Sequence, residues 1–247
     1  MIFHIPHSST DIPAEYRSLF LLDSTQLASE LLLMTDHFTD ELFLASATND
    51  DSFLRFPVSR LLVDPERFPD DAQEEMSKVG MGAIYRLTHN GESLKDDQSK
   101  REELLTRYFS PHHRNLTARV GESLDLANDA LIVDCHSFPK SPLPYELDQT
   151  PTRPQICIGV DEFHTPSYLI DTLVNFFSKA GLSVSVNAPF TGSIVPLDYY
   201  HSEKKVRSIM IEVRRDGYMD ESTGEKSDNF SHMQSLIQGA TSVLRTK

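Results

Sequence analysis

The chain has 247 residues, a formal net charge of −14 and a hydrophobic content of 39%. This length can bury a sizeable core, and the composition excludes collagen-like repeats, intrinsic disorder and low-complexity function. The acidic charge argues against binding to nucleic acid or to anionic membranes, and no apolar run approaches the ~20 residues that cross a bilayer. The first residues lack the pattern of a secretory signal, so a cytoplasmic protein is the default expectation.

The hydrophobic pattern predicts strands that alternate with helices. Such alternation is typical of an α/β fold with a mostly parallel or mixed sheet. Because no repeat or linker is evident, residues 1–247 are expected to form a single domain. Strands are expected at residues 2–6, 53–58, 131–136, 155–160, 183–187 and 206–213, helices at 23–42, 99–127 (interrupted near Pro111), 165–180 and from 228 onward, and loops at 76–97 and 139–154.

Three predicted strand ends carry unusual polar residues, at 6–9, 134–137 and 212–216. Functional sites of open α/β sheets gather at strand ends. Two histidines on separate strands, His7 and His136, together with a carboxylate match the three protein ligands of a catalytic zinc. Taken singly, His7 also fits a turn cap, and His136 fits a hydrogen-bonded histidine at a strand end.

The alternation of side chains along a strand separates the residues of segment 131–136 into two groups. Asp134 and His136 share one face, while Cys135 points to the other. Cys135 is therefore interpreted as a core residue, and Asp134 as a carboxylate that orients a neighbouring histidine. The only other cysteine is Cys157, so neither a disulfide framework nor a four-cysteine zinc site is available.

Glu212 lies within an apolar strand, where a carboxylate is costly to bury unless it is paired or functional. The alternative to a functional role is an ion pair with Arg214 or Arg215. Burial would raise its pKa toward the range that suits proton transfer, and we favour that role. Arg60 and Arg67 flank another apolar segment and could bind carboxylates, although a surface ion pair is the simpler role for either one alone.

Several compact catalytic motifs are absent from the sequence. It contains no His-Glu-x-x-His, no Gly-x-Ser-x-Gly and no phosphate-binding Walker loop. The pair Gly80 and Gly82 lacks the third glycine of a dinucleotide-binding fingerprint. Serine-triad and nucleotide chemistry therefore have little support.

Taken together, these segments resemble the N-formylglutamate amidohydrolase (N-formylglutamate deformylase) family. That family is related in fold to the zinc carboxypeptidases and to the succinylglutamate desuccinylase and aspartoacylase enzymes. The most specific part is the run from Ile209 to Arg215. The similarity is spread over residues 6–9, 35–42, 58–64, 134–139, 158–166, 187–192, 209–215 and 218–221.

The resemblance implies a three-layer αβα fold with a mixed central sheet, like that of the zinc carboxypeptidases (phosphorylase/hydrolase-like). It implies zinc-dependent hydrolysis of an N-acyl amino acid, most plausibly N-formyl-L-glutamate to formate and L-glutamate, as at the end of one histidine-degradation route. One Zn²⁺ per chain is expected. The matched positions are His7 and His136 as zinc ligands and Glu212 as the catalytic glutamate. Arg60 and Arg67 match the arginines that bind the substrate carboxylates, with Arg214 as a weaker candidate for the same role. His113 is expected to line the substrate site.

Two positions depart from the related families. Carboxypeptidase-like enzymes have a glutamate ligand three residues after the first histidine, where this chain has Thr10. The resemblance then favours Asp36 as the third ligand. Glu66 also replaces the asparagine of the family's Asp-x-Asn-Arg segment. Two alternatives therefore stay open: another N-acyl amino acid or a peptide as substrate, or a non-catalytic protein that binds a small acid.

Overall fold

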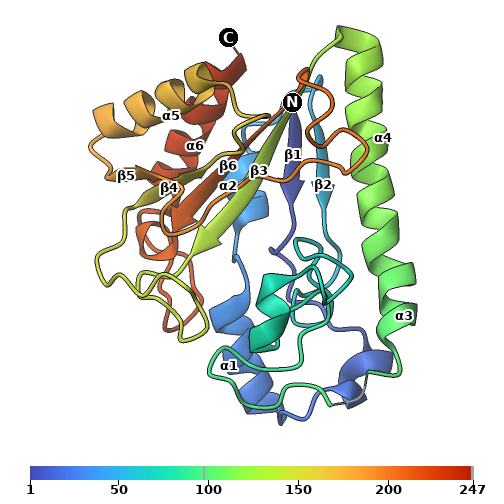
Figure 1. Ribbon diagram of the computed structural model, residues 1–247. Helices are drawn as coiled ribbons and strands as arrows, with labels where there is room; N and C mark the ends of the chain where they lie inside the picture. Colours follow the sequence, from blue (N-terminus) through green and yellow to red (C-terminus); the bar gives the residue numbers. More distant parts are fainter. Residues whose placement is uncertain (97, 246–247) are drawn as a thin grey trace.

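The computed structural model describes residues 1–96 and 98–245. In this part of the chain, six strands form one sheet in the order β2-β1-β3-β6-β4-β5, with helices on both faces (Figure 1). The predicted α/β architecture is therefore confirmed. The strands are β1 (Ile2–Ile5), β2 (Ser52–Arg55), β3 (Ala130–Phe138), β4 (Ile156–Gly159), β5 (Val184–Val186) and β6 (Val206–Arg214), and the helices are α1 (Ser24–Met34), α2 (Thr39–Leu44), α3 (Arg101–Leu104), α4 (Ser110–Ala127), α5 (Ser167–Lys179) and α6 (Phe230–Arg245).

The sheet is mixed, as the family resemblance implied and as one of the two arrangements that the alternating pattern allowed. Strands β2, β1, β3 and β6 run parallel to one another, whereas β4 pairs with β6 in the antiparallel sense and β5 runs parallel to β4. The carboxyl ends of β1, β3 and β6 consequently meet at one edge of the sheet. This edge is where an open α/β fold places its ligands.

The two faces of the sheet differ in polarity. One face is apolar along β1, β3 and β6, includes Cys135, and packs against α2, α5 and α6. The opposite face is covered by α4, and at the strand starts Ile2 and Ile132 pack against the helix. Toward the carboxyl ends of the strands, the same face carries buried polar side chains. They are His4, Asp134, His136 and Glu212.

The predicted helix at 23–42 is wrong in one respect, because it consists of two helices. Helix α1 ends at Met34, and Phe38 adopts a left-handed conformation (φ 62°) just before α2. Leu27 packs in a different apolar cluster from Leu42. The regular spacing of apolar residues over 23–42 therefore came from two helices that pack against different parts of the core. The backbone N–H of Asp36 donates to the carbonyl of His7, and this tertiary bond holds the break at the end of β1.

The long helix predicted at 99–127 is interrupted, as expected, near Pro111. A π-helical turn at Leu105–Phe109 separates α3 from α4, and the proline occupies the first turn of α4. The expected loop at 76–97 contains the end of a short 3₁₀ helix, Glu75–Val79, and residue 97 lies outside the described residues. None of the helices described is both long and apolar enough to span a membrane.

Candidate metal centre

Three predicted metal ligands meet at the carboxyl edge of the sheet. His7 follows β1, His136 lies in β3, and Asp36 comes from the turn between α1 and α2. The Oδ2 atom of Asp36 lies 3.3 Å from His136 Nδ1 and 3.7 Å from His7 Nδ1. All three side chains are buried, and they form a group that could hold a metal ion.

A carboxylate orients each of the two histidines. The Nε2–H of His7 donates to Asp64 at 2.8 Å, and that of His136 donates to Asp134 at 3.0 Å. In both rings Nδ1 faces Asp36. A carboxylate on the far nitrogen fixes the ring and leaves the near nitrogen as an acceptor, which is the usual support of a metal-bound histidine.

The donor atoms suit a divalent cation. His7 Nδ1 is closed to solvent and has no hydrogen-bond partner among the described residues, an arrangement that is costly unless a ligand binds there. Zinc–ligand bonds of about 2.0–2.1 Å in a tetrahedron give ligand separations of about 3.3 Å, close to the two distances to Asp36. Asp36 also accepts hydrogen bonds from Arg215 and from the Ser137 backbone, so its carboxylate is held in place.

Glu212 stands beside this group. It lies opposite His136 in the register between β3 and β6, and its side chain is buried. Burial raises its pKa to about 8, although the charges of His136 and Arg215 oppose that shift. In the part of the chain that is described, Glu212 Oε2 has no hydrogen-bond partner and forms no ion pair with Arg214 or Arg215.

The two predicted substrate-binding arginines differ in how many hydrogen bonds they already make within the protein. Arg60 donates to Asp64 at 2.9 Å and to the hydroxyl of Tyr85 at 3.1 Å. Arg67 has a buried Nε without a partner in residues 1–96 and 98–245, and its Nη1 makes only a long contact of 3.5 Å with the carbonyl of Glu66. Arg67 therefore keeps donors for an anionic ligand, whereas Arg60 mainly fixes Asp64.

Two further predicted residues lie apart from the three ligands. The guanidinium of Arg214 donates to Asp216 and to the carbonyl of Arg153. His113 is half-buried and its Nε2 donates to the carbonyl of Pro65, so it supports the segment that carries Arg67. Both side chains are occupied by contacts within the protein.

Several buried polar residues of this region were not predicted from the sequence. Asp64 accepts hydrogen bonds from His7, Arg60 and Tyr85, so it joins the metal group to the arginines. The only sign of Asp64 in the sequence was its position directly after the apolar run Leu61–Val63. His4 was assigned to a strand without a role, although its alternation with Ile2 places it on the polar face. The remaining members are His112, Arg215 and Tyr85.

Comparisons with known proteins bear on the family and the fold of the chain. The sequence profile described as N-formylglutamate amidohydrolase matches residues 1–219. A solved N-formylglutamate amidohydrolase from Ralstonia eutropha JMP134 is 22% identical, with a TM-score of 0.84 over 100% of this chain and 94% of that one. A gene product from Agrobacterium tumefaciens is 20% identical, with a TM-score of 0.67 over 99% and 91% of the two chains. No curated protein sequence matches the chain significantly.

Proposed function

The chain belongs to the N-formylglutamate amidohydrolase family, a family of hydrolases, and we propose that it hydrolyses the amide bond of an N-acyl amino acid, with N-formyl-L-glutamate as the first substrate to test. One observation carries the proposal. His7 Nδ1 and Glu212 Oε2 are buried at the same strand edge without partners among the described residues. A ligand acceptor and a proton acceptor, both unsatisfied, are what a metal-dependent hydrolase requires.

The ligands of the metal would be His7 Nδ1, Asp36 Oδ2 and His136 Nδ1. A set of two imidazoles and one carboxylate fits zinc, and three protein ligands leave a fourth position open. When bound, such an ion polarises the acyl oxygen and lowers the pKa of a bound water. Asp64 and Asp134 hold the two rings with Nδ1 toward Asp36, where the ion would bind.

Glu212 is the proton carrier of the proposed reaction. Its carboxylate takes a proton from the attacking water, whose oxygen forms a bond to the acyl carbon. The bond between the acyl carbon and the amide nitrogen then breaks, and Glu212 returns the proton to that nitrogen. From N-formyl-L-glutamate the products are formate and L-glutamate, and Glu212 is again a carboxylate.

Arg67 is the proposed anchor of the substrate. Its Nε, which has no hydrogen-bond partner among the described residues, suits a carboxylate of the amino acid, and holding that group orients the amide for attack. Arg60 acts on the site through Asp64, which it holds against the Nε2 of His7. We place the reaction in the cytoplasm, in a histidine-degradation route that ends in formate and glutamate.

The test measures formate released from N-formyl-L-glutamate by the purified protein, with and without a zinc chelator. Release that stops with chelator and returns with added Zn²⁺ supports both the reaction and the metal. A panel of N-acetyl and longer N-acyl amino acids and peptides, run in parallel, identifies a different acyl group. A metal-replete protein that cleaves none of these amides contradicts the proposal and favours a protein that only binds small acids.

A further inference from the structure

We propose that the chain holds a second divalent cation beside the first, bound by His4, Glu66 and Asp134. These residues form a separate group that could hold a metal ion. His4 Nδ1 lies 2.8 Å from Asp134 Oδ1 and 3.3 Å from Glu66 Oε1. This site is additional to the metal of the proposed function, and its existence does not depend on which amide is cleaved.

His136 lies between the two sites and offers a fourth donor atom to the second. Its Nε2 lies 3.0 Å from Asp134 Oδ1 and 3.6 Å from Glu66 Oε2. The four groups alternate around a ring in the order His4, Asp134, His136 and Glu66. The distances between neighbouring nitrogen and oxygen atoms are 2.8 to 3.6 Å. Tetrahedral coordination at about 2.0–2.1 Å requires separations of about 3.3 Å. Such a mixed donor set suits Zn²⁺, Co²⁺ or Mn²⁺.

The charges of the group also favour a cation. Within the described residues, the ion-pair partners of Glu66 and Asp134 are histidines, with no lysine or arginine among them. Two neighbouring carboxylates removed from water are costly without a compensating positive charge. Glu66 Oε1 is closed to solvent and accepts no hydrogen bond from the part of the chain described. The competing arrangement is a proton on Glu66 in place of the ion.

The fold presents these ligands in the same way as those of the first site. His4 and Asp134 are paired in the register of β1 and β3. His4 Nε2 lies 2.8 Å from Nε2 of His112 on α4, which holds the ring with Nδ1 toward Asp134 and Glu66. His112 therefore supports His4 as Asp64 supports His7. The backbone N–H of Glu66 donates to Asp64, so one carboxylate positions a ligand of each site.

With an ion on both sides, the ring of His136 would lie between the two cations. Coordination of a second ion by His136 Nε2 would release the proton of that nitrogen to solvent. The Glu66 side chain is 15% exposed, so the second site is open to solvent on that side. The added positive charge lies beside a site that we propose for an anionic substrate, where it favours binding.

The experiment counts metal ions per chain, independently of turnover. Apoprotein prepared with a chelator is titrated with Co²⁺, freed of excess ion and analysed by mass spectrometry, while the cobalt absorption bands are recorded. We expect two ions per wild-type chain, and one in each of Glu66→Gln and His4→Asn. Asp36→Asn should also retain one ion, with a spectrum different from that of Glu66→Gln because a different site is filled.

The matched control is Glu30→Gln, which removes another buried glutamate bonded to a histidine, His89, away from the site. It should retain two ions. One ion in the wild type, or two in Glu66→Gln and His4→Asn, overturns the second site. Formate release with only one bound ion would contradict this inference and leave the proposed function standing. Two bound ions without cleavage of any amide would support the second site and contradict the proposed function.

Discussion

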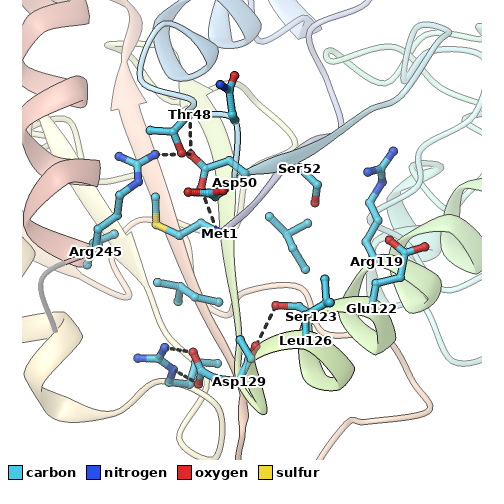
Figure 2. A pocket seen from close by; sticks show the side chains of 17 residues that line it. Met1, Thr48, Asp50, Ser52, Arg119, Glu122, Ser123, Leu126, Asp129 and Arg245 are labelled. Carbon is cyan, nitrogen blue, oxygen red and sulfur yellow. Dashed lines mark hydrogen bonds and ion pairs between the residues drawn. The ribbon is translucent and has the colours of Figure 1, made fainter.

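The two ends of the central strands contrast in how their charged groups are used. At the amino end, a cavity of about 790 Å³ is lined by residues of β1, β2, α4 and α6 (Figure 2). Two of the three arginines that line it are held in ion pairs, Arg207 with Asp129 and Arg245 with Asp51. At the carboxyl end, the buried acceptors His7 Nδ1 and Glu212 Oε2 have no hydrogen-bond partner among the described residues. These unpartnered acceptors, and not the volume of a cavity, are the reason for proposing the reactive site at the carboxyl end.

Replacing Glu212 with glutamine should have the largest effect on catalysis. The variant keeps the volume of the side chain but cannot accept a proton, so kcat should fall by about 10²–10⁴-fold. Bound metal and unfolding temperature should change little, because the carboxylate has no partner in the described structure to lose. Formate release and metal content are measured on the same preparation.

A matched change at the amino end sharpens this contrast. Asp129→Asn weakens the ion pair with Arg207 and should leave kcat unchanged. Near-normal turnover in Glu212→Gln would remove that glutamate from the mechanism. A large loss of turnover in Asp129→Asn would show that the two ends are coupled.

Replacing Arg67 with alanine should weaken substrate binding more than turnover. A hydrogen bond to a charged group contributes about 1.5–3 kcal/mol, so KM should rise by about 10–100-fold. The control is Arg119→Ala at the amino end, which removes another arginine whose buried Nε has no hydrogen-bond partner among the described residues. Steady-state kinetics should show a KM for Arg119→Ala equal to that of the wild type. An unchanged KM in Arg67→Ala would exclude Arg67 as the anchor.

Lys95 gives the carboxyl end a dependence on pH. Its Nζ donates to the carbonyls of Leu61 and Leu62, within the segment that carries Arg60 and Asp64. Burial lowers the pKa of Lys95 from 10.5 to about 7. Between those values the unfolded chain binds more protons than the folded chain, so this residue makes stability rise with pH.

The expected size of this effect is about 2 kcal/mol between pH 7 and 9, since each pKa unit corresponds to about 1.4 kcal/mol. Urea unfolding of the wild type and of Lys95→Met at pH 7, 8 and 9 isolates it, because other titrating groups cancel in the difference. The free energy of unfolding of the wild type, minus that of the variant, should increase as the pH rises. A constant difference would mean that Lys95 titrates near its ordinary value.

Local patterns predicted the parts of the site that belong to strands. His136 and Glu212 could be placed because alternation and an apolar run define which face a strand residue occupies. Asp36 came from family resemblance, since the helix break that presents it depends on a hydrogen bond to His7, 29 positions earlier. The difference between Arg60 and Arg67 depends on Tyr85, whose approach from an irregular segment no periodicity indicates. Long-range polar contacts thus set the limit of the prediction.

Asp51, at the amino end, should affect stability and leave catalysis unchanged. Burial raises its pKa, but hydrogen bonds from the Met1 amino group, Thr48 and Arg245 outweigh that effect and lower the pKa from 3.8 to about 2. A lowered pKa in the folded state stabilises the protein above about pH 4, and this contribution is lost as the pH falls toward 2. The shift corresponds to at most about 2.5 kcal/mol, and solvent screening reduces it to about 1 kcal/mol.

Asp51→Asn should therefore lower the free energy of unfolding by about 1 kcal/mol at pH 7, and its difference from the wild type should vanish near pH 2. Urea unfolding across this range tests the stability, and formate release at pH 7 tests the function. Equal kcat in the two proteins would mean that the ion pairs at the amino end stabilise the fold and do not affect catalysis. A lower kcat at unchanged stability would instead show that the cavity of Figure 2 affects the proposed metal site. It would contradict the assignment of stability to one end of the strands and catalysis to the other.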